Sequence, residues 1–374
     1  MRLIPTNCIK EGNYLAKTMY DTQGRVLLSA GVKLTATILR RVEQNGLLSL
    51  YINDQYSEGE IEDVIKPELR LRAVKALKDS FDDIVKYNEY KDKAVTEQQK
   101  RVAASIKFQN TNNLTKLVDD IIEQVLDQKN ILINLVDIKS MDNYTYEHCV
   151  NVIILSIIIG VELKLDRKRL YDLAIGAMLH DVGKVFIPKD VLQKPGSLTS
   201  EEYDIIKTHS VKGYDYLKDD VCVSIVSRIV ALQHHEKIDG SGYPDGVKGD
   251  KIHEFARIVA IADVYDALTS DRPYRRAMSP NEAIEYLMGG ADRYFDFNIV
   301  CSFVKKIVPY PVGTMIRLST GAIAIVEIIT PGYPLRPVVK IISDKDKLVK
   351  EYSLNLMMNN SIVIEGIQFK VPEV

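Results

Sequence analysis

The stretch AMLHDVGKVFIP, residues 177–188, places an adjacent histidine and aspartate, His180 and Asp181, directly after an apolar segment. Two adjacent side chains cannot face the same way on an ideal helix. At the end of a helix or at a bend, however, they can address two neighbouring metal ions, and the aspartate can bridge them. The stretch therefore predicts one part of a two-metal site.

Further candidate ligands lie on both sides of this stretch. All six histidines of the chain fall between His148 and His253, a clustering that is not expected of scattered core histidines. Imidazole and carboxylate groups together suit Fe, Mn, Zn or Co, and two such ions about 3.5–4 Å apart favour phosphoester hydrolysis. His253 fits no ligand role and is predicted to lie on the surface. The predicted metal ligands are His148, His180, Asp181, His209, His234, His235 and Asp263.

The length of 374 residues predicts more than one domain. Short apolar runs with turn signals at the start predict a small α+β module, and helical patterns dominate the centre. β-branched runs separated by Gly and Pro near the end predict a small antiparallel β domain. The expected divisions are residues 1–60, a helical linker at 61–130, a catalytic domain at 131–308 and a β domain at 309–374.

The linker contains stretches such as LTKLVDDIIEQVLD, in which apolar residues recur at spacings of three and four. This spacing predicts amphipathic helices. Two interpretations are open: the helices brace the next domain as a packed linker, or they pair with a second copy of the chain in a homodimer.

Composition excludes several classes of protein. Lys and Arg total 49 and Asp and Glu 51, a net charge of −2, which argues against a partner bound through bulk positive charge, such as a nucleic-acid polymer. The four cysteines form no CxxC pair, which favours reduced thiols. The N-terminus shows no signal peptide, and the apolar run Val150–Val161 is too short to cross a membrane. We expect a soluble, cytoplasmic protein with no membrane partner.

Several long motifs, in order, resemble the HD-GYP subgroup of the HD-domain phosphohydrolases. They are HDVGK, the loop IPKDVLQKPGSLTSEEYDIIKTH, HHEKIDGSGYPDG and DVYDALTSDRPYR, and the Gly-Tyr-Pro signature is residues 242–244. The resemblance covers about residues 140–300. It implies a mainly α protein, with an all-helical HD-type catalytic domain that hydrolyses the bacterial second messenger cyclic di-GMP, flanked by the α+β and β modules.

The resemblance also implies how the ligands are shared. His148, His180, Asp181 and Asp263 match the basic HD metal set, and His209, His234 and His235 match the ligands of a second metal, with Asp181 bridging. Some family members hold a third ion through a glutamate that Tyr144 replaces here, so two ions are expected. Fe or Mn is favoured, and Zn, Co and Ni stay open.

Cations that converge near the metals are expected to bind the phosphodiesters of the substrate. Lys184, Arg272 and Arg275 match family positions that contact the ligand, and Asp181 and Lys184 are the predicted catalytic residues. Tyr243 is expected to stack on guanine or to hydrogen-bond a phosphate. Asp266 is predicted either to contact the substrate or to orient a metal ligand.

One departure concerns the loop where family members commonly have Phe-Asp-Pro. This chain has Phe295, Asp296 and Phe297, which puts the local loop shape in doubt.

The sequence therefore predicts that a metal-activated hydroxide hydrolyses cyclic di-GMP to pGpG, with GMP as the product of a second cleavage. Three alternatives stay open: an HD phosphohydrolase that acts on another cyclic dinucleotide or nucleotide, a sensor that binds cyclic di-GMP without turnover, and a structural metal domain in a partner-binding scaffold.

Overall fold

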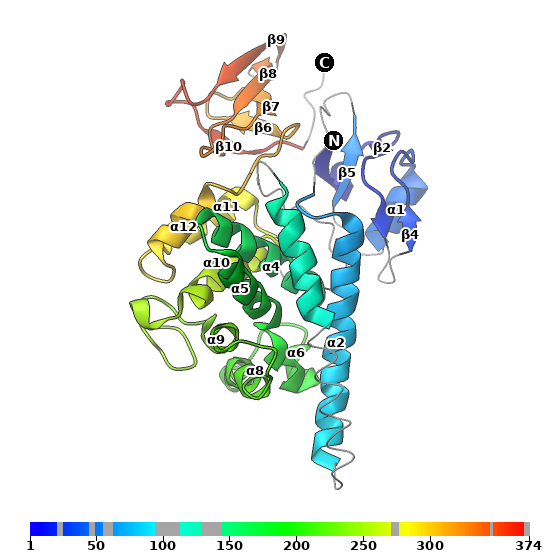
Figure 1. The fold of residues 1–374 in the computed structure, drawn as a ribbon. Helices are drawn as coiled ribbons and strands as arrows, with labels where there is room; N and C mark the ends of the chain where they lie inside the picture. Colours follow the sequence, from blue (N-terminus) through cyan, green and yellow to red (C-terminus); the bar gives the residue numbers. More distant parts are fainter. Residues whose placement is uncertain are drawn as a thin grey trace.

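The structure is a computed structural model, and the predicted fold class is confirmed: a mainly helical protein with a small module at each end. Figure 1 shows the helical body in the centre, the N-terminal module beside α2 and the C-terminal sheet at the α11–α12 end. The residues that the structure describes are 1–20, 25–44, 49–54, 63–93, 113–128, 144–270, 277–344 and 347–369.

The N-terminal module combines two small antiparallel sheets with one helix. The first sheet has the order β1-β5-β2, and the second pairs β3 with β4. The buried side chains of Ile4, Leu15, Leu50 and Ile52 form its core, as expected where one face of a sheet is covered. The elements are β1 (Arg2–Pro5), η1 (Thr6–Cys8), β2 (Tyr14–Leu15), β3 (Met19–Tyr20), β4 (Val26–Leu28), α1 (Ala36–Gln44) and β5 (Ser49–Asn53).

The named elements of the central part, among the residues described, are all helices, joined by loops. Residues 113–126 form a further helix beside those named next. The elements are α2 (Pro67–Lys93), α4 (Tyr144–Glu162), α5 (Arg167–Leu179), η3 (Val182–Phe186), α6 (Lys189–Leu192), α7 (Ser200–Lys207), α8 (His209–Leu217), α9 (Ile225–Gln233), η4 (Gly249–Lys251), α10 (Glu254–Leu268), α11 (Pro280–Gly289) and α12 (Phe297–Val304).

Helix α4 is the centre of this body. Every residue from Cys149 to Gly160 is buried, because a helix that is apolar on all sides needs cover on all sides. Within the described residues, α4 is the one helix apolar and long enough to span a membrane, from Thr145 to Glu162. Here α2, α5, α10 and α12 pack around it, so it is the core helix of a folded domain.

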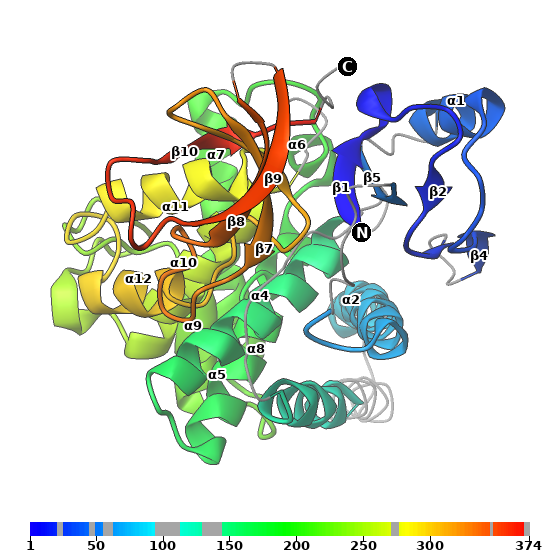
Figure 2. The same ribbon diagram turned by 90° about the horizontal axis from the view of Figure 1, so that it is seen from above.

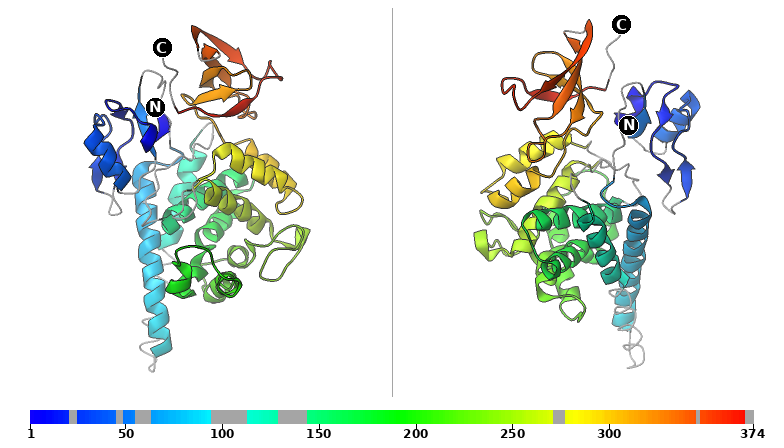
Figure 3. Two further views of the ribbon diagram at one scale, coloured as in Figure 1. Left: turned by 180° about the vertical axis from the view of Figure 1, so that it is seen from behind. Right: turned by 45° about the horizontal axis from the view of Figure 1, so that its top comes forward.

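The helices of the predicted linker belong to the same hydrophobic core. Leu69, Leu77 and Phe81 of α2, and Val118 and Ile121 of the helix at 113–126, are buried together with the apolar residues of α4. The linker helices therefore brace the central body. In Figure 3, α2 also extends past that body at its C-terminal end.

The C-terminal module is a five-stranded antiparallel sheet with the order β10-β6-β7-β8-β9. Figure 2 shows it above the α11–α12 side of the helical body, away from the N-terminal module. The strands are β6 (Met315–Leu318), β7 (Ile323–Ile328), β8 (Val338–Asp344), β9 (Lys347–Asn355) and β10 (Ile364–Ile367).

Side-chain caps define where the helices around the candidate site begin. Asp166 accepts from the amide of Arg169 at the start of α5, and Ser224 accepts from that of Ser227 at the start of α9. His253 caps α10 in the same way through its ring Nδ1. It is half-buried, so the prediction of a plain surface residue is corrected: its role is to begin the helix that carries Asp263.

The unusual Phe295-Asp296-Phe297 loop keeps a regular shape. The Asp296 carboxylate caps α12 and also pairs with Arg257 at 2.7 Å. Phe297 is the first residue of α12 and is about half exposed. The family's proline would stand at the same first helical position, where proline is favoured. Phe297 in its place therefore leaves the turn unchanged.

Candidate metal centre

The predicted histidine and aspartate ligands lie together at the ends of α5, α8 and α9, near the start of α4 and on α10. His180 ends α5, His209 begins α8 and His234 ends α9. Asp181 follows directly after His180, where the chain turns into the short η3 helix. All four are at most 1% exposed. The chain changes direction at each of these helix ends, and this allows side chains from different helices to meet in one place.

The ring nitrogens of three histidines are oriented by backbone carbonyls. The Nδ1 atoms of His180 and His209 lie 2.7 Å from the carbonyl oxygens of Ala177 and Ile206, and Nδ1 of His234 lies 3.0 Å from that of Val230. A carbonyl can only accept, so each ring donates from Nδ1 and carries its lone pair on Nε2. The Nε2 atoms are thus the available ligand atoms.

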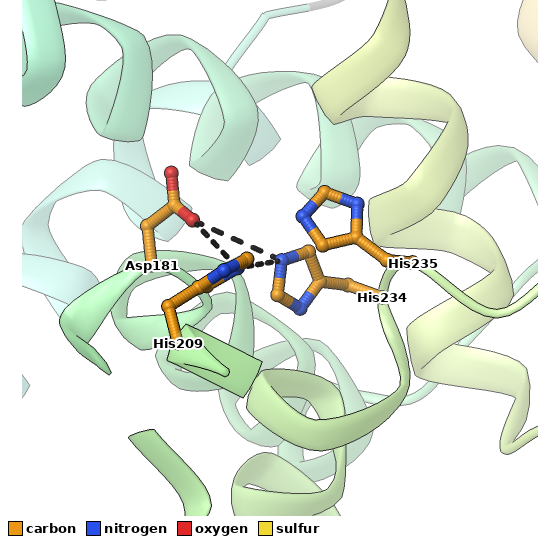
Figure 4. Close-up of side chains that lie close together, drawn as sticks. All are labelled: Asp181, His209, His234 and His235. Carbon is orange, nitrogen blue, oxygen red and sulfur yellow. Dashed lines mark hydrogen bonds and ion pairs between the residues drawn. The ribbon is translucent and has the colours of Figure 1, made fainter. Parts of the chain in front are cut away.

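These lone pairs converge with a carboxylate oxygen. Figure 4 shows Asp181, His209, His234 and His235 pointing toward one another. The Nε2 atoms of His209 and His234 are 3.3 Å apart, and Asp181 Oδ1 lies 3.4 Å and 3.8 Å from them. Burial lowers the pKa of His209, and burial together with the neighbouring His235 lowers that of His234 well below its usual range. Both imidazoles are therefore neutral lone-pair donors.

A second group lies on the other side of Asp181. His148 Nε2 is 3.1 Å from Asp263 Oδ1, and His180 Nε2 is 3.3 Å from Asp181 Oδ2. Burial opposes a charge on His148, but hydrogen bonds to Asp263 and Asp266 outweigh it and raise the pKa of His148 to about 10. The same contacts hold the pKa of Asp263 well below its usual range, against the effect of burial.

The residues therefore form two ligand groups within the described part of the chain. The first is Asp181, His209, His234 and His235, and the second is His148, His180 and Asp263; within each, the ligand atoms lie within 4.8 Å of one another. The buried Nε2 of His180 and Oδ1 of Asp181 have no hydrogen-bond partner. Unpartnered buried acceptors are costly, and mixed nitrogen and oxygen donors suit divalent transition metals. The donor set fits metal ions.

Asp181 connects the two groups, because each of its oxygens faces one of them. Oδ2 lies beside His180, and Oδ1 beside His209. Burial opposes its charge, but Lys184 and His180 lower the pKa of Asp181 well below its usual range. The carboxylate is therefore ionised, and it would offer one oxygen to an ion in each ligand group.

Two glycines let the backbone of η3 approach α8 closely. A Cβ on Gly183 would lie 1.9 Å from the carbonyl oxygen of His209 and 2.6 Å from the amide of Gly213. Only glycine fits such an approach. The Gly of HDVGK therefore brings Asp181 within reach of His209.

The two groups open into a cavity of about 310 Å³. Lys184 lines it, and its Nζ lies 2.5 Å from Asp181 Oδ2; burial opposes its charge, but Asp181 raises the pKa of Lys184 overall. Tyr243 lines the same cavity with its ring centroid 4.7 Å from that of His235, and burial raises the pKa of its hydroxyl. Ile206 and Leu268 add an apolar wall.

Asp266 does not line this cavity but lies behind His148. Its Oδ2 is 2.7 Å from His148 Nδ1, and its Oδ1 accepts from Asn151 Nδ2 at 2.8 Å. Arg70 of α2 in turn donates to Asn151 Oδ1 at 2.6 Å. Of the two roles predicted for Asp266, the geometry corresponds to orienting a metal ligand, and substrate contact is not supported.

Some predicted residues cannot be placed. Arg272 and Arg275 lie outside the described residues, and so does the side chain of Tyr144, the first residue of α4.

Two positioning residues were missed by the sequence analysis. Asn151 follows His148 by three residues and interrupts a long apolar run, so its place on the same helix face was a usable signal. Glu236, directly after the histidine pair, is 4% exposed, and its Oε1 accepts from the amides of Asp245 and Gly246. It anchors the Gly-Tyr-Pro loop, which no pattern in the sequence indicated.

Comparison with known proteins assigns the class of this chain. Residues 118–299 match the model of the HD domain, and residues 315–368 match that of a KOW domain associated with HD domains. The central part of the chain therefore belongs to the HD-domain family.

Its relatives assign the subgroup. A Pseudomonas aeruginosa protein named cyclic di-GMP phosphodiesterase PA4108 is 40% identical over 217 residues, 58% of this chain and 52% of that protein. A Vibrio cholerae protein named 3'3'-cGAMP-specific phosphodiesterase 1 is 38% identical over 166 residues, 44% of this chain and 38% of the relative. Together with the Gly-Tyr-Pro motif, these matches confirm the predicted HD-GYP type. The chain spans about half the length of the first of these relatives, and less of the second.

Among solved structures, Bd1817, an HDG"Y"P protein from Bdellovibrio bacteriovorus, matches 81% of this chain and 97% of its own chain. The sequence identity is 17% and the TM-score is 0.47.

Proposed function

We propose that this protein is a metal-dependent phosphodiesterase that hydrolyses cyclic di-GMP to pGpG in bacterial second-messenger signalling. The observation that carries the proposal is the pair of ligand groups that Asp181 connects and that open into one cavity beside Lys184. The name of the P. aeruginosa relative supports cyclic di-GMP as the substrate. That of the V. cholerae relative favours a hybrid cyclic dinucleotide as the second candidate.

The proposed cofactors are two divalent metal ions, one in each ligand group, with Fe or Mn favoured over Zn, Co and Ni. Such a pair supplies Lewis-acid polarisation of a phosphoryl group and a nucleophile at neutral pH. The division of the ligands into two groups supports the number two, as does the Tyr144 substitution.

The side chains of the protein have separate roles in this proposal. Asp181 stays ionised and fixes the position of one ligand group relative to the other. Lys184 carries three N–H donors, so those not bonded to Asp181 are available to a phosphate oxygen as negative charge develops on it. The raised pKa of Tyr243 keeps its hydroxyl a donor at neutral pH. Arg272 and Arg275 are proposed as additional phosphate ligands from their sequence positions alone.

The decisive experiment is anaerobic purification with metal quantitation, followed by a timed assay of cyclic di-GMP, 3'3'-cGAMP and pGpG. We expect two ions per chain and conversion of cyclic di-GMP to pGpG; the pGpG reaction shows whether GMP is formed. Three ions per chain would contradict the two-metal proposal. Tight binding of cyclic di-GMP by the metal-loaded protein without product would contradict the enzyme and favour a sensor.

The double variant His180→Ala, Asp181→Ala tests the site. It should lose hydrolysis while its circular dichroism stays helical, because the residues end a helix without forming its core. His253→Asn is the matched control: asparagine is also a good N-cap, so the helix start is preserved and activity should be unchanged. Activity that survives in the double variant would refute the assignment.

We also propose the division of the chain at residues 60, 130 and 308, a cytoplasmic location, and a homodimer through the linker. The projection of α2 beyond the helical body supports the homodimer (Figure 1), and light scattering on the full chain tests it.

A further inference from the structure

A second cavity adjoins the candidate metal centre. Its volume is about 330 Å³, and it shares His235 and Tyr243 with the first cavity as a common wall. Its other walls come from α7 and from the loop after α9: Tyr203, Lys207, Lys237, Ser241 and Gly242. Sequence analysis assigned no role to Tyr203, Lys207, Lys237 or Ser241, and it used Gly242 only as part of the Gly-Tyr-Pro signature.

The two cavities differ in charge. The first contains the carboxylates of Asp181 and Asp263, whereas no carboxylate lines the second among the residues described. The second instead receives two lysines from separate elements, Lys207 and Lys237. A cavity with two cations and no acidic lining favours an anionic ligand.

Both lysines are held near this cavity by weak contacts. Lys237 Nζ lies 4.6 Å from the ring centroid of Tyr294. Lys207 Nζ pairs with Asp204 at 2.5 Å, but the Asp204 side chain is 69% exposed. Exposed ion pairs of this kind contribute little, so a phosphate can take the place of that carboxylate.

The cavity also has aromatic walls. Tyr203 is 49% exposed and lies on α7, which contacts α8, the helix that begins at His209. Tyr243 forms the shared wall. Aromatic rings of this kind are surfaces on which nucleobases stack.

The wall between the two cavities is preformed. A Cβ on Gly242 would lie 2.4 Å from the amide nitrogen of Lys237 and 2.5 Å from the carbonyl oxygen of His235. The Gly-Tyr-Pro loop is therefore packed directly against the backbone of the histidine pair.

We propose that the second cavity binds the half of the cyclic dinucleotide that is not being cleaved. Lys207 and Lys237 contact its second phosphodiester, and Tyr203 stacks on a base. The inference rests on the proposed function. A cyclic dinucleotide carries two phosphodiesters, and only one of them can lie at the metal centre at a time. A ligand with a single phosphodiester would occupy the first cavity alone.

The test compares two substrates, cyclic di-GMP and bis(4-nitrophenyl) phosphate, which has one phosphodiester. In the Lys207→Ala, Lys237→Ala double variant, we expect the KM for cyclic di-GMP to rise at least about tenfold, by analogy with other charged phosphate contacts. The ratio of kcat/KM for cyclic di-GMP to that for bis(4-nitrophenyl) phosphate should fall by the same factor.

Further variants separate the stacking contact and control for surface charge. Tyr203→Ala should weaken cyclic di-GMP binding about five- to hundredfold, the range of base–aromatic stacking, and Tyr203→Phe should restore it. Lys218→Ala is the matched control, because Lys218 pairs with Asp215 three residues away on α8, as Lys207 does with Asp204 on α7, but lines neither cavity.

The outcomes distinguish the two claims. If kcat/KM falls equally for cyclic di-GMP and bis(4-nitrophenyl) phosphate, or if the ratio of the two values stays unchanged in all variants, the inference is overturned and the proposed function stands. Wild-type protein that cleaves bis(4-nitrophenyl) phosphate but no cyclic dinucleotide would overturn the proposed function and the inference with it.

Discussion

Gly183→Ala tests how the metal centre is assembled. The added Cβ would lie 1.9 Å from the carbonyl oxygen of His209, and Cβ contacts under 3.0 Å are essentially never seen. The difference, 3.0 minus 1.9, means that η3 and α8 must separate by at least about 1.1 Å. Forcing extra volume into a packed site costs about 1–3 kcal/mol, so we expect a melting temperature lowered by several degrees.

The separation also moves His209 away from Asp181. In the wild-type structure, His209 Nε2 lies 3.4 Å from Asp181 Oδ1. A misplacement of about 1 Å can cost on the order of a hundredfold in rate, so we expect a comparable loss of phosphodiesterase activity and a lower metal content.

The assay measures melting, bound metal and initial rate side by side. Gly289→Ala at the end of α11 is the control, since nothing lies within 4 Å of its Cβ position, and it should behave as wild type. Wild-type metal content and melting temperature in Gly183→Ala would refute the reasoning, because the contact would then not constrain the site.

Three other predictions concern the groups around the centre. Asp266→Asn should weaken metal binding about 10- to 100-fold in a metal titration, since it loses the carboxylate that orients His148; equal affinity would contradict this role. Glu236→Ala should speed amide hydrogen exchange in residues 240–248, whereas Glu236→Gln keeps an acceptor and should change it less; identical exchange in both would exclude an anchoring role. In chelator-treated protein, the folded-state pKa of His148 is raised to about 10. The contribution of protonated His148 to the free energy of unfolding is therefore complete below about pH 6.5 and is lost as the pH rises toward 10. The folded-state pKa of His235 is lowered to about 3 by burial, so stability is also lost as the pH falls from about 6.5 toward 3. Urea unfolding of this protein should therefore show greatest stability near pH 6.5, and a flat profile would contradict both assignments.

A line of polar contacts, partly buried at Arg70 and buried beyond it, connects the linker helix to the candidate metal centre. Arg70 of α2 bonds to Asn151, which bonds to Asp266, which bonds to His148. The N-terminal half of α2 thus contributes to the position of a candidate metal ligand, in addition to covering the apolar face of α4. The bracing helix and the site are parts of one packed body.

Much of the site could be predicted because its chemistry depends on residue types that are rare in this chain. Six histidines within one segment, with an adjacent His180-Asp181 pair, were enough to indicate a metal centre. The HD-GYP motifs then indicated the all-helical fold. Residues without rare chemistry were missed: Tyr203, Lys207 and Lys237 are common types in ordinary surroundings, and only their place around one cavity distinguishes them.

The sequence alone thus determined which atoms are available as ligands, since imidazole and carboxylate groups bring their chemistry wherever they lie. Tertiary structure decided how they are divided. His148 and Asp266 are 118 residues apart in the chain and 2.7 Å apart in space, and each oxygen of Asp181 faces a different group. The physical reason is packing: the buried α4, and the glycine contact between η3 and α8, set which helix ends meet. Pattern and spacing along a chain do not contain those distances.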